Sequence, residues 1–159
     1  MDPVDSIPTV LARATVTALL SLTQEGLCAI CKTDSAAHED VLGFPEGFIF
    51  EMRVLPSGPR LRVRKQGDKF VRDEGSGRPT LSIQFKHLRH ALRVIAMVDD
   101  VPKAIANDRL VIDGELSWAM RIGRITERMM GALVPRALSA ASGSVRLYAE
   151  MVSAERVFS

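Results

Sequence analysis

The sequence predicts an α+β fold in which helices cover one face of a mainly antiparallel sheet. Three observations predict it. Apolar and polar residues alternate in the middle of the chain, helical spacing occurs on both sides of that region, and strands and helices are segregated along the sequence. The chain has 159 residues, of which 47% are hydrophobic and 25% charged, so we expect one compact domain with its own core.

The first segment has helical periodicity. Its apolar residues recur at spacings of three and four, at Ile7, Val10, Leu11, Ala14, Ala18 and Leu22. Ser6 is expected to cap this helix and Pro8 to occupy an early helical position. The pattern fades at Gly26. We expect a further short helical turn at 27–32 and a loop at 33–47, where turn-forming and polar residues gather.

Alternation of apolar and polar side chains predicts strands in the middle of the chain. The expected strands lie at residues 48–55, 60–64, 70–71 and 80–85. Pro and Gly between them predict turns. Because the strands are consecutive and the turns short, we expect an antiparallel meander with one apolar face and one polar, arginine-rich face.

Helical periodicity returns after residue 86. We expect a helix with its apolar face at Leu88, Ala91, Leu92 and Ile95. A short helix at 102–107, a strand at 109–113 and a long helix from Glu115 follow. The apolar stripe of the long helix is Trp118, Ile122, Ile125, Met129 and Leu133. Pro135 is expected to interrupt it, and a last amphipathic segment is expected after Gly143.

Composition and motifs argue against several functional classes. The net charge of +2 is too small to predict nucleic-acid binding, and the aromatic residues occupy core-type positions. The longest uninterrupted apolar runs are about five residues, and the acidic start of the chain is unlike a secretory signal. No nucleotide-binding, hydrolase-elbow or zinc-protease motif is present. We therefore expect a cytoplasmic, non-enzymatic protein with no catalytic residues, no cofactor and no metal.

Residues 47–122 resemble the sterol carrier protein type 2 (SCP-2) family in order and spacing. The resemblance is carried by the strand opening at Gly47–Phe50, the arginine-rich second strand, Thr80–Ile83, and above all the segment Lys103–Glu115. Asn107 and Asp108 stand where the family has a glycine. The last strand and the longer helix after it also resemble bacterial relatives that assist ubiquinone biosynthesis and are thought to hold polyprenyl intermediates.

The resemblance implies a five-stranded sheet, helices on one face and an apolar tunnel between them. It places an N-terminal helical segment and loop at 1–45, the lipid-binding core at 46–142 and a C-terminal amphipathic segment at 143–159, all in one compact domain. The candidate ligand-binding residues are the apolar residues on the inward faces: Phe48, Phe50, Met52, Ile83, Phe85, Leu88, Leu92, Ile95, Leu110, Ile112, Trp118, Met120, Ile122, Ile125 and Met129. Periodicity alone assigns the same residues to an ordinary filled core.

Polar residues offer weaker signals. Arg53, Arg62, Arg64 and Lys65 are expected on the polar sheet face, where they either meet anionic lipid headgroups or are simply solvated. Cys28 and Cys31 form a lone CxxC without further metal ligands, so two packed thiols are expected. His87 and His90 are interpreted as exposed or capping groups. Asp113 and Glu115 fit a strand-to-helix turn.

Three functional hypotheses remain open. The first is non-enzymatic carriage of one hydrophobic ligand: a lipid, fatty acyl chain, sterol or polyprenyl quinone. The second is a protein-interaction module or homodimer with a filled core, which would use a stripe through Ile125, Met129, Leu133 and Leu138. The third is a lipid-directed enzyme, which would need His38 or Asp113 to point into the cavity. The sequence favours carriage and leaves the oligomeric state and the ligand open.

Overall fold

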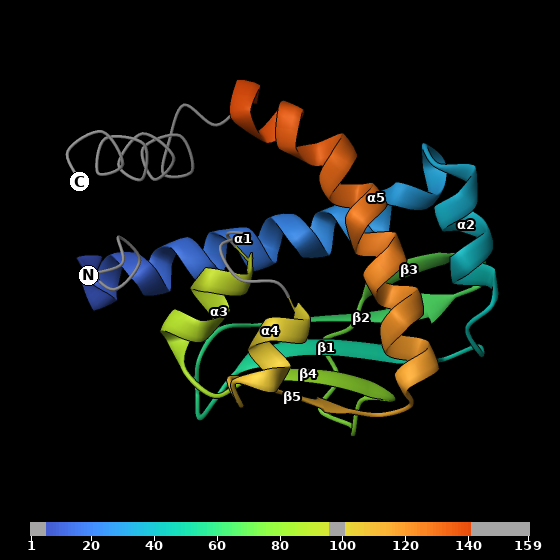
Figure 1. Cartoon of the computed structure of the whole chain (residues 1–159). Helices are drawn as coiled ribbons and strands as arrows, with labels where there is room; N and C mark the ends of the chain where they lie inside the picture. The colour runs from blue at the N-terminus through green and yellow to red at the C-terminus, as the bar shows by residue number, and fades with distance from the viewer. Residues whose placement is uncertain (1–5, 96–100, 141–159) are drawn as a thin grey trace.

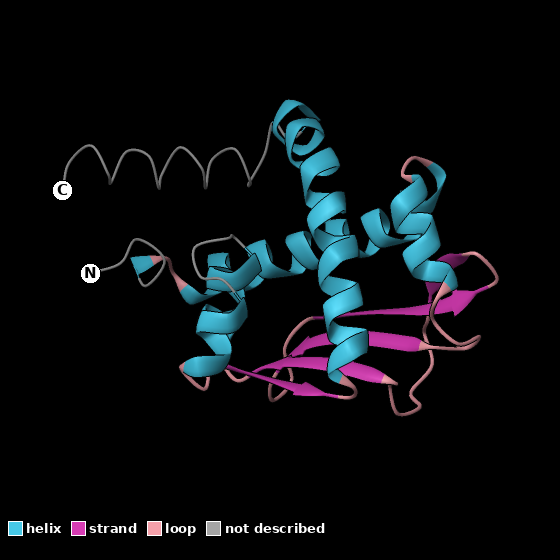
Figure 2. Cartoon of the chain, turned by 45° about the vertical axis from the view of Figure 1, so that its right-hand side comes forward, coloured by secondary structure: helices cyan, strands magenta, loops and turns pink. Residues whose placement is uncertain are grey.

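The computed structural model describes residues 6–95 and 101–140; of residues 101, 102, 130 and 132–140 it describes the backbone only. The fold has two layers, a five-stranded sheet and a layer of helices on one of its faces (Figures 1 and 2). The elements are α1 (Thr9–Ala29), η2 (Ile30–Lys32), α2 (Ser35–Leu42), β1 (Ile49–Val54), β2 (Arg60–Gln66), β3 (Lys69–Arg72), β4 (Leu81–Phe85), α3 (Leu88–Ile95), α4 (Val101–Ala106), β5 (Leu110–Asp113) and α5 (Leu116–Ala140). The predicted α+β class is confirmed.

The strand order is β3-β2-β1-β4-β5, and every neighbouring pair except β1 and β4 is antiparallel. The expected meander is therefore correct only for β1 to β3. The chain leaves β3 at the sheet edge, crosses to the far side of β1 and enters β4 parallel to β1, with Phe50 opposite Leu81. A parallel pair needs such a crossover connection, and Gly and Pro in residues 73–80 allow it to run without a helix.

Helix α1 differs from the prediction at both ends. It begins at Thr9 directly after Pro8, no side chain caps it, and Ser6 lies outside it. It continues past Gly26 to Ala29, and the expected short turn beyond is the 3-10 helix η2. One face of α1 is buried, with Ala12, Thr15, Val16, Leu20, Gly26 and Leu27 in the interior.

Thr9–Lys32 is also long and apolar enough to cross a membrane by length and composition, with a mean hydropathy of 1.3. The helix meets this averaged criterion although its uninterrupted apolar runs are short, because Thr and Ser between the apolar residues hardly lower the mean. Since core helices pass the same test, the packing of α1 is the more informative observation. It lies along the sheet and alongside α3 (Figure 1).

Helix α2 occupies residues that were expected to form a loop. Its N-terminus is capped by Asp34, whose carboxylate accepts the backbone N–H of Ala37 at 3.0 Å. An N-cap carboxylate stabilises the first turn, and the same hydrogen bond lowers the pKa of Asp34. Ala37 and Val41 are the buried residues of this helix. The Asp-Ser-Ala-Ala sequence was the available signal, and the surrounding polar residues obscured it.

The last strand and the final helix follow the prediction closely. Asp108 precedes β5 with φ of +57°, so it takes the left-handed conformation that a glycine would adopt easily. Gly114, with φ of +136°, then turns the chain into α5. Helix α5 runs through Pro135 to Ala140, so the expected interruption is not observed. The φ angle of proline suits a helix, but its ring removes one backbone hydrogen bond and crowds the carbonyl group four residues earlier. The segment after Gly143 lies outside the described residues.

Candidate functional site

Most candidate ligand-binding residues meet in one buried cluster between the sheet and the helices. Those that are fully buried are Phe48, Phe50, Ile83, Phe85, Leu92, Leu110, Ile122, Ile125 and Met129. Those that pack half-buried against them are Met52, Leu88, Ile95, Ile112 and Trp118. Met120 differs, because it is 60% exposed and points away from the cluster. It lies only two residues from Trp118 on the helix, which rotates it to another face.

An aromatic group lies at the α2 end of this cluster. Phe44 stacks on Phe48 with ring centroids 4.3 Å apart, and Trp118 lies 5.4 Å from Phe44 and 5.7 Å from Phe48. Phe70 on β3 extends the group, 5.8 Å from Phe44. Phe44 and Phe70 were not among the predicted site residues. Phe70 could have been found from its strand position, whereas Phe44 was hidden in the expected loop.

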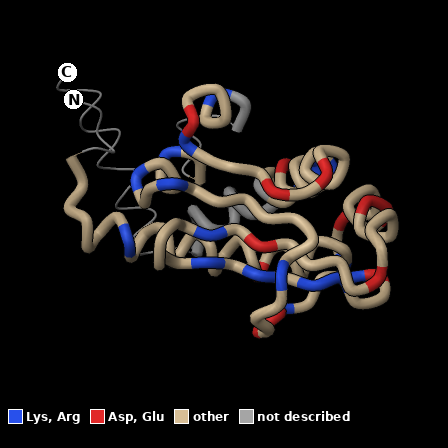
Figure 3. Tube along the Cα trace, turned by 90° about the horizontal axis from the view of Figure 1, so that it is seen from below, with Lys and Arg blue, Asp and Glu red and all other residues tan. Residues whose placement is uncertain are grey.

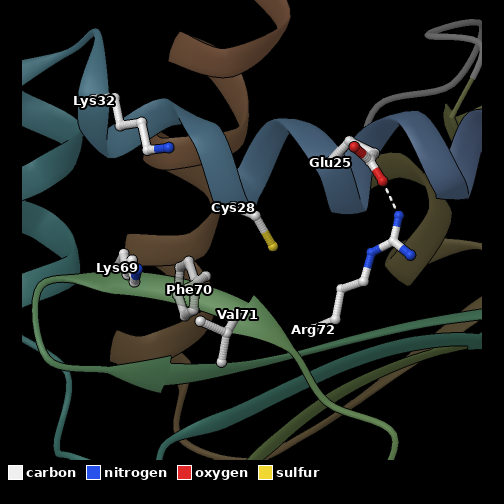
Figure 4. Close-up of a pocket in the computed structure, with 7 residues that line it drawn as sticks. All are labelled: Glu25, Cys28, Lys32, Lys69, Phe70, Val71 and Arg72. Atoms are coloured by element: carbon white, nitrogen blue, oxygen red, sulfur yellow. Dashed lines mark ion pairs between the residues drawn. The ribbon is translucent and has the colours of Figure 1, made fainter.

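A pocket of about 390 Å³ lies between the C-terminal end of α1, η2 and the edge strand β3 (Figure 4). It is lined by Glu25, Cys28, Lys32, Lys69, Phe70, Val71 and Arg72. This volume is within the range of about 300–1,000 Å³ found for small-molecule sites. The pocket adjoins the predicted site through Phe70, which belongs to the buried cluster, but none of the predicted ligand-binding residues lines it.

Charge is distributed unevenly in this pocket. Arg72 of β3 forms an ion pair with Glu25 of α1 and so joins strand and helix at one end. Lys32 and Lys69 lie at the other end, and Cys28, Phe70 and Val71 lie between the two ends (Figure 4).

Both thiols near the pocket are free and half-buried, and both pack against the core as predicted. Burial raises the pKa of the Cys28 thiol, and burial, followed by the charge of Asp68, raises that of Cys31. A raised thiol pKa means that less thiolate is present at neutral pH, and thiolate is the reactive form. Neither cysteine is therefore placed as an activated nucleophile.

Helix α5 is held against α2 by a row of ion pairs. Asp40 lies 3.6 Å from Arg121 and 3.4 Å from Arg124, and Asp34 lies 3.5 Å from Arg128. The Arg121 guanidinium also lies 5.6 Å from the centre of the Phe44 ring. These contacts are partly exposed to solvent, so each contributes about 1 kcal/mol or less. They attach α5 to α2 above the buried cluster.

The four predicted headgroup-binding cations do not share a solvent-facing surface. Figure 3 shows basic residues at many positions along the strands, but two of the four are buried. The side chain of Arg62 is 4% exposed and bonds Asp73 at 2.6 Å under the crossover connection. Lys65 shares the opposite face with Val63, where its ammonium donates to the carbonyl oxygens of Leu42 and Phe44. Arg53 and Arg64 remain partly or fully exposed.

The polar residues considered for catalysis lie outside the pocket. His38 bonds Asp68 at 3.2 Å, and Asp113 lies 3.6 Å from Arg78 with its side chain mostly in solvent. His87 and His90 have ring centroids 5.6 Å apart, and Nδ1 of His87 accepts the backbone N–H of Arg89. Within residues 6–95 and 101–140, no three His, Cys, Asp or Glu side chains are grouped so that they could hold a metal ion.

The fold is that of the sterol carrier protein 2 domains: a five-stranded, mostly antiparallel sheet with helices on one face. Among solved structures, sterol carrier protein 2 from Yarrowia lipolytica in its apo form matches 71% of this chain and 90% of its own, with a TM-score of 0.50 and 12% identity. A UbiJ-SCP2 ubiquinone synthesis protein matches 73% of this chain and 96% of its own (TM-score 0.48, 11% identity). The sterol carrier protein domain 2 of Helicoverpa armigera matches 68% and 85% (TM-score 0.46, 18% identity).

No family model matches the sequence, and no curated protein matches it. At these identities the structural likeness defines the fold alone. The SCP-2-like architecture predicted from residues 47–122 is confirmed at that level. Function must be argued from the chain's own residues, since one fold supports many functions.

Proposed function

We propose that the protein binds one hydrophobic ligand non-covalently and carries it without chemical change. The observation that supports this most directly is the buried apolar cluster between the sheet and the helices. Its aromatic residues Phe44, Phe48 and Trp118 adjoin the partly charged pocket beside β3 through Phe70. The sterol carrier protein 2 fold adds support, because the proteins that share it include carriers named for sterols. A lipid, acyl chain, sterol or polyprenyl quinone fits this chemistry, and a cytoplasmic location belongs to the same proposal.

In this proposal the ligand lies between the sheet and α5. Its walls are the predicted inward-facing residues other than Met120, together with Phe44 and Phe70. Methionine side chains adapt their shape at low cost, so Met52 and Met129 suit a cavity that opens when a ligand enters. The partly exposed ion pairs of α5 with α2 are individually weak. They allow α5 to shift while keeping it attached.

The affinity follows from the apolar area that becomes buried. Each buried methylene contributes about 0.8 kcal/mol, so an alkyl chain with about ten buried methylenes gains about 8 kcal/mol. Association and ordering cost at least about 4 kcal/mol in return. The net gain of at most about 4 kcal/mol corresponds to millimolar binding of such a chain. Micromolar binding therefore needs about fifteen buried methylenes, and discrimination between chain lengths should be weak.

Native mass spectrometry of the freshly purified protein, with mass analysis of its organic extract, tests the proposal. A bound lipid near unit stoichiometry is the expected result. Trp118 is the only tryptophan and lies half-buried beside Phe44, so its emission should shift when dodecanoate, cholesterol or a short-chain quinone is added. An empty protein whose Trp118 emission responds to none of these probes would overturn the proposal.

A matched pair of variants places the ligand. Ile125→Phe adds volume at a buried position of α5, whereas Ile105→Phe adds it at an exposed position of α4. The first should reduce ligand capacity at least fivefold and the second should leave it unchanged, with circular dichroism confirming that both fold. Equal binding by both variants would place the ligand elsewhere.

An interaction module remains the second candidate, but not through the stripe first expected. Ile125 and Met129 are buried in the core of the protein. The side chains of Leu133 and Leu138 belong to the part of α5 for which only the backbone is described. Leu116 and Met120, 68% and 60% exposed, are one turn apart on α5 and form the apolar surface that favours this candidate. Association that grows with protein concentration and is lost in Met120→Glu would support it.

A further inference from the structure

The pocket beside β3 is polarised along its length. Helix α1, continued by η2, runs past strand β3. Glu25 pairs with Arg72 at one end of the pocket, and Lys32 and Lys69 lie at the other (Figure 4). The seven positions from Glu25 to Lys32 on the helical side span about 10 Å, and so do the three positions from Lys69 to Arg72 on the strand. The pocket is therefore about as long as a short alkyl chain, with an ion pair at one end and two ammonium groups at the other.

The two lysines are available to a ligand. Both side chains are exposed, and neither forms an ion pair within the described part of the chain; Lys69 interacts only electrostatically with its neighbour Asp68. Asp68 is already bonded to His38. Arg72, by contrast, is neutralised by Glu25. The two ammonium groups outnumber the one carboxylate beside them, that of Asp68, so net positive charge remains at the Lys32–Lys69 end.

The surface between the two ends is apolar. Phe70 is almost fully buried, Val71 lies beside it on the edge strand, and the Sγ atom of Cys28 points from α1 toward them (Figure 4). An apolar floor with cations at one end is complementary to an amphiphile whose single tail lies on the floor. A neutral or cationic head would leave the two ammonium groups without a counter-charge.

We propose that this pocket binds a single-chain amphiphile with an anionic head, its carboxylate between Lys32 and Lys69 and its tail over Cys28, Phe70 and Val71 toward the Glu25–Arg72 pair. The inference rests on the proposed function and makes it more specific, because it names the ligand class and an outer site. It differs from the ligand position proposed beneath α5 in its place in the fold and in using charge for recognition.

Alkylation of Cys28 by N-ethylmaleimide in the full-length Cys31→Ser variant reports occupancy of this pocket. Octanoate should slow the reaction, octanol should slow it less, and octylammonium should not slow it at comparable concentrations. Acetate, which offers the head without a tail, should have no effect. Cys31 does not line the pocket, so its alkylation in Cys28→Ser should be unaffected by octanoate.

Charge-removing variants test the recognition. Lys32→Gln combined with Lys69→Gln should raise the octanoate concentration for half-protection about five- to tenfold and leave octanol unchanged, as expected for two exposed charge contacts. Arg78→Gln combined with Lys86→Gln removes the same charge outside this pocket and should change neither value.

Each remaining outcome is decisive. Equal protection by octanoate and octylammonium, or an unchanged octanoate value in the double lysine variant, would overturn the anionic-head assignment. If dodecanoate shifts Trp118 emission while Cys28 stays unprotected, hydrophobic binding stands and this pocket is not its site. If neither probe responds, both proposals fail.

Discussion

Replacing Arg62 with methionine tests whether a buried ion-pair network holds the crossover from β3 to β4 against the sheet. The Arg62 side chain is 4% exposed and lies 2.6 Å from Asp73 and 3.7 Å from Glu51, whose side chains are 9% and 5% exposed. Removing one partner of a buried pair costs about 3–5 kcal/mol. Arg60 and Arg64 stay within 4 Å of the same carboxylates. We therefore expect a loss of about 3 kcal/mol in the free energy of unfolding.

Urea unfolding followed by circular dichroism measures this loss. Arg60→Met is the matched control. The Arg60 side chain is half-exposed, and the buried Glu51 keeps Arg62 as a partner when Arg60 is replaced, so the expected loss is no more than about 1 kcal/mol. Combining Arg62→Met with Asp73→Asn should recover part of the loss, since one uncompensated carboxylate is removed. If Arg62→Met costs no more than Arg60→Met, the network does not stabilise the crossover and the reasoning is wrong.

The same network makes stability depend on pH. The hydrogen bond from Arg62 lowers the pKa of Asp73 below its usual 3.8. A carboxyl whose pKa is lower in the folded state stabilises the fold above the unfolded value, and this contribution is lost as the pH falls through the folded value. Asp73→Asn should therefore flatten the acid limb of the stability curve below about pH 4, measured by thermal unfolding in a pH series.

Three further perturbations probe other parts of the fold. Lys65→Met leaves two carbonyl oxygens at the end of α2 without their donor and should cost about 2 kcal/mol in urea unfolding; an unchanged midpoint would contradict this. Gly114→Ala places a Cβ 2.9 Å from the Thr80 carbonyl oxygen at φ of +136°, so thermal unfolding should show a loss of at least about 2 kcal/mol. Burial, then the nearby His87, lowers the pKa of His90 below its usual 6.5, so protonation below about pH 6.5 favours the unfolded state. The His90→Gln variant should therefore lose less stability than the original protein as the pH falls below about 6.5, measured by urea unfolding at several pH values.

The sequence was most informative where a helix or strand shows a regular period of apolar residues over neighbouring positions. Alternation located β1, β2 and β4 to within a residue or two, and helical spacing located α3 and the start of α5. It failed where a few polar residues decide the structure. Helix α2 depends on the Asp34 cap and two buried apolar residues, a pattern too short to rise above its polar surroundings.

The candidate site was predicted in part. The members of the buried cluster were predicted from the apolar faces of the strands and helices. A face whose apolar residues repeat with the period of a strand or a helix must be covered by another part of the protein. The pocket beside β3 was not predicted, because it arises where Cys28 of α1 and Phe70 of the edge strand meet across 42 positions of sequence. The spacing of residues along the chain does not predict a contact between segments so far apart in sequence.

The sequence by itself determined the α+β class, most of the elements and which residues are apolar enough to form the core. Only the tertiary structure decided how the strands are ordered, that β1 and β4 are parallel, and which charges are buried. Lys65 shares its strand face with Val63 and could have been assigned by counting, but Arg62 is buried only because residues 73–80 pass over it. Alternation distinguishes two faces of a strand, and long-range packing determines what each face meets.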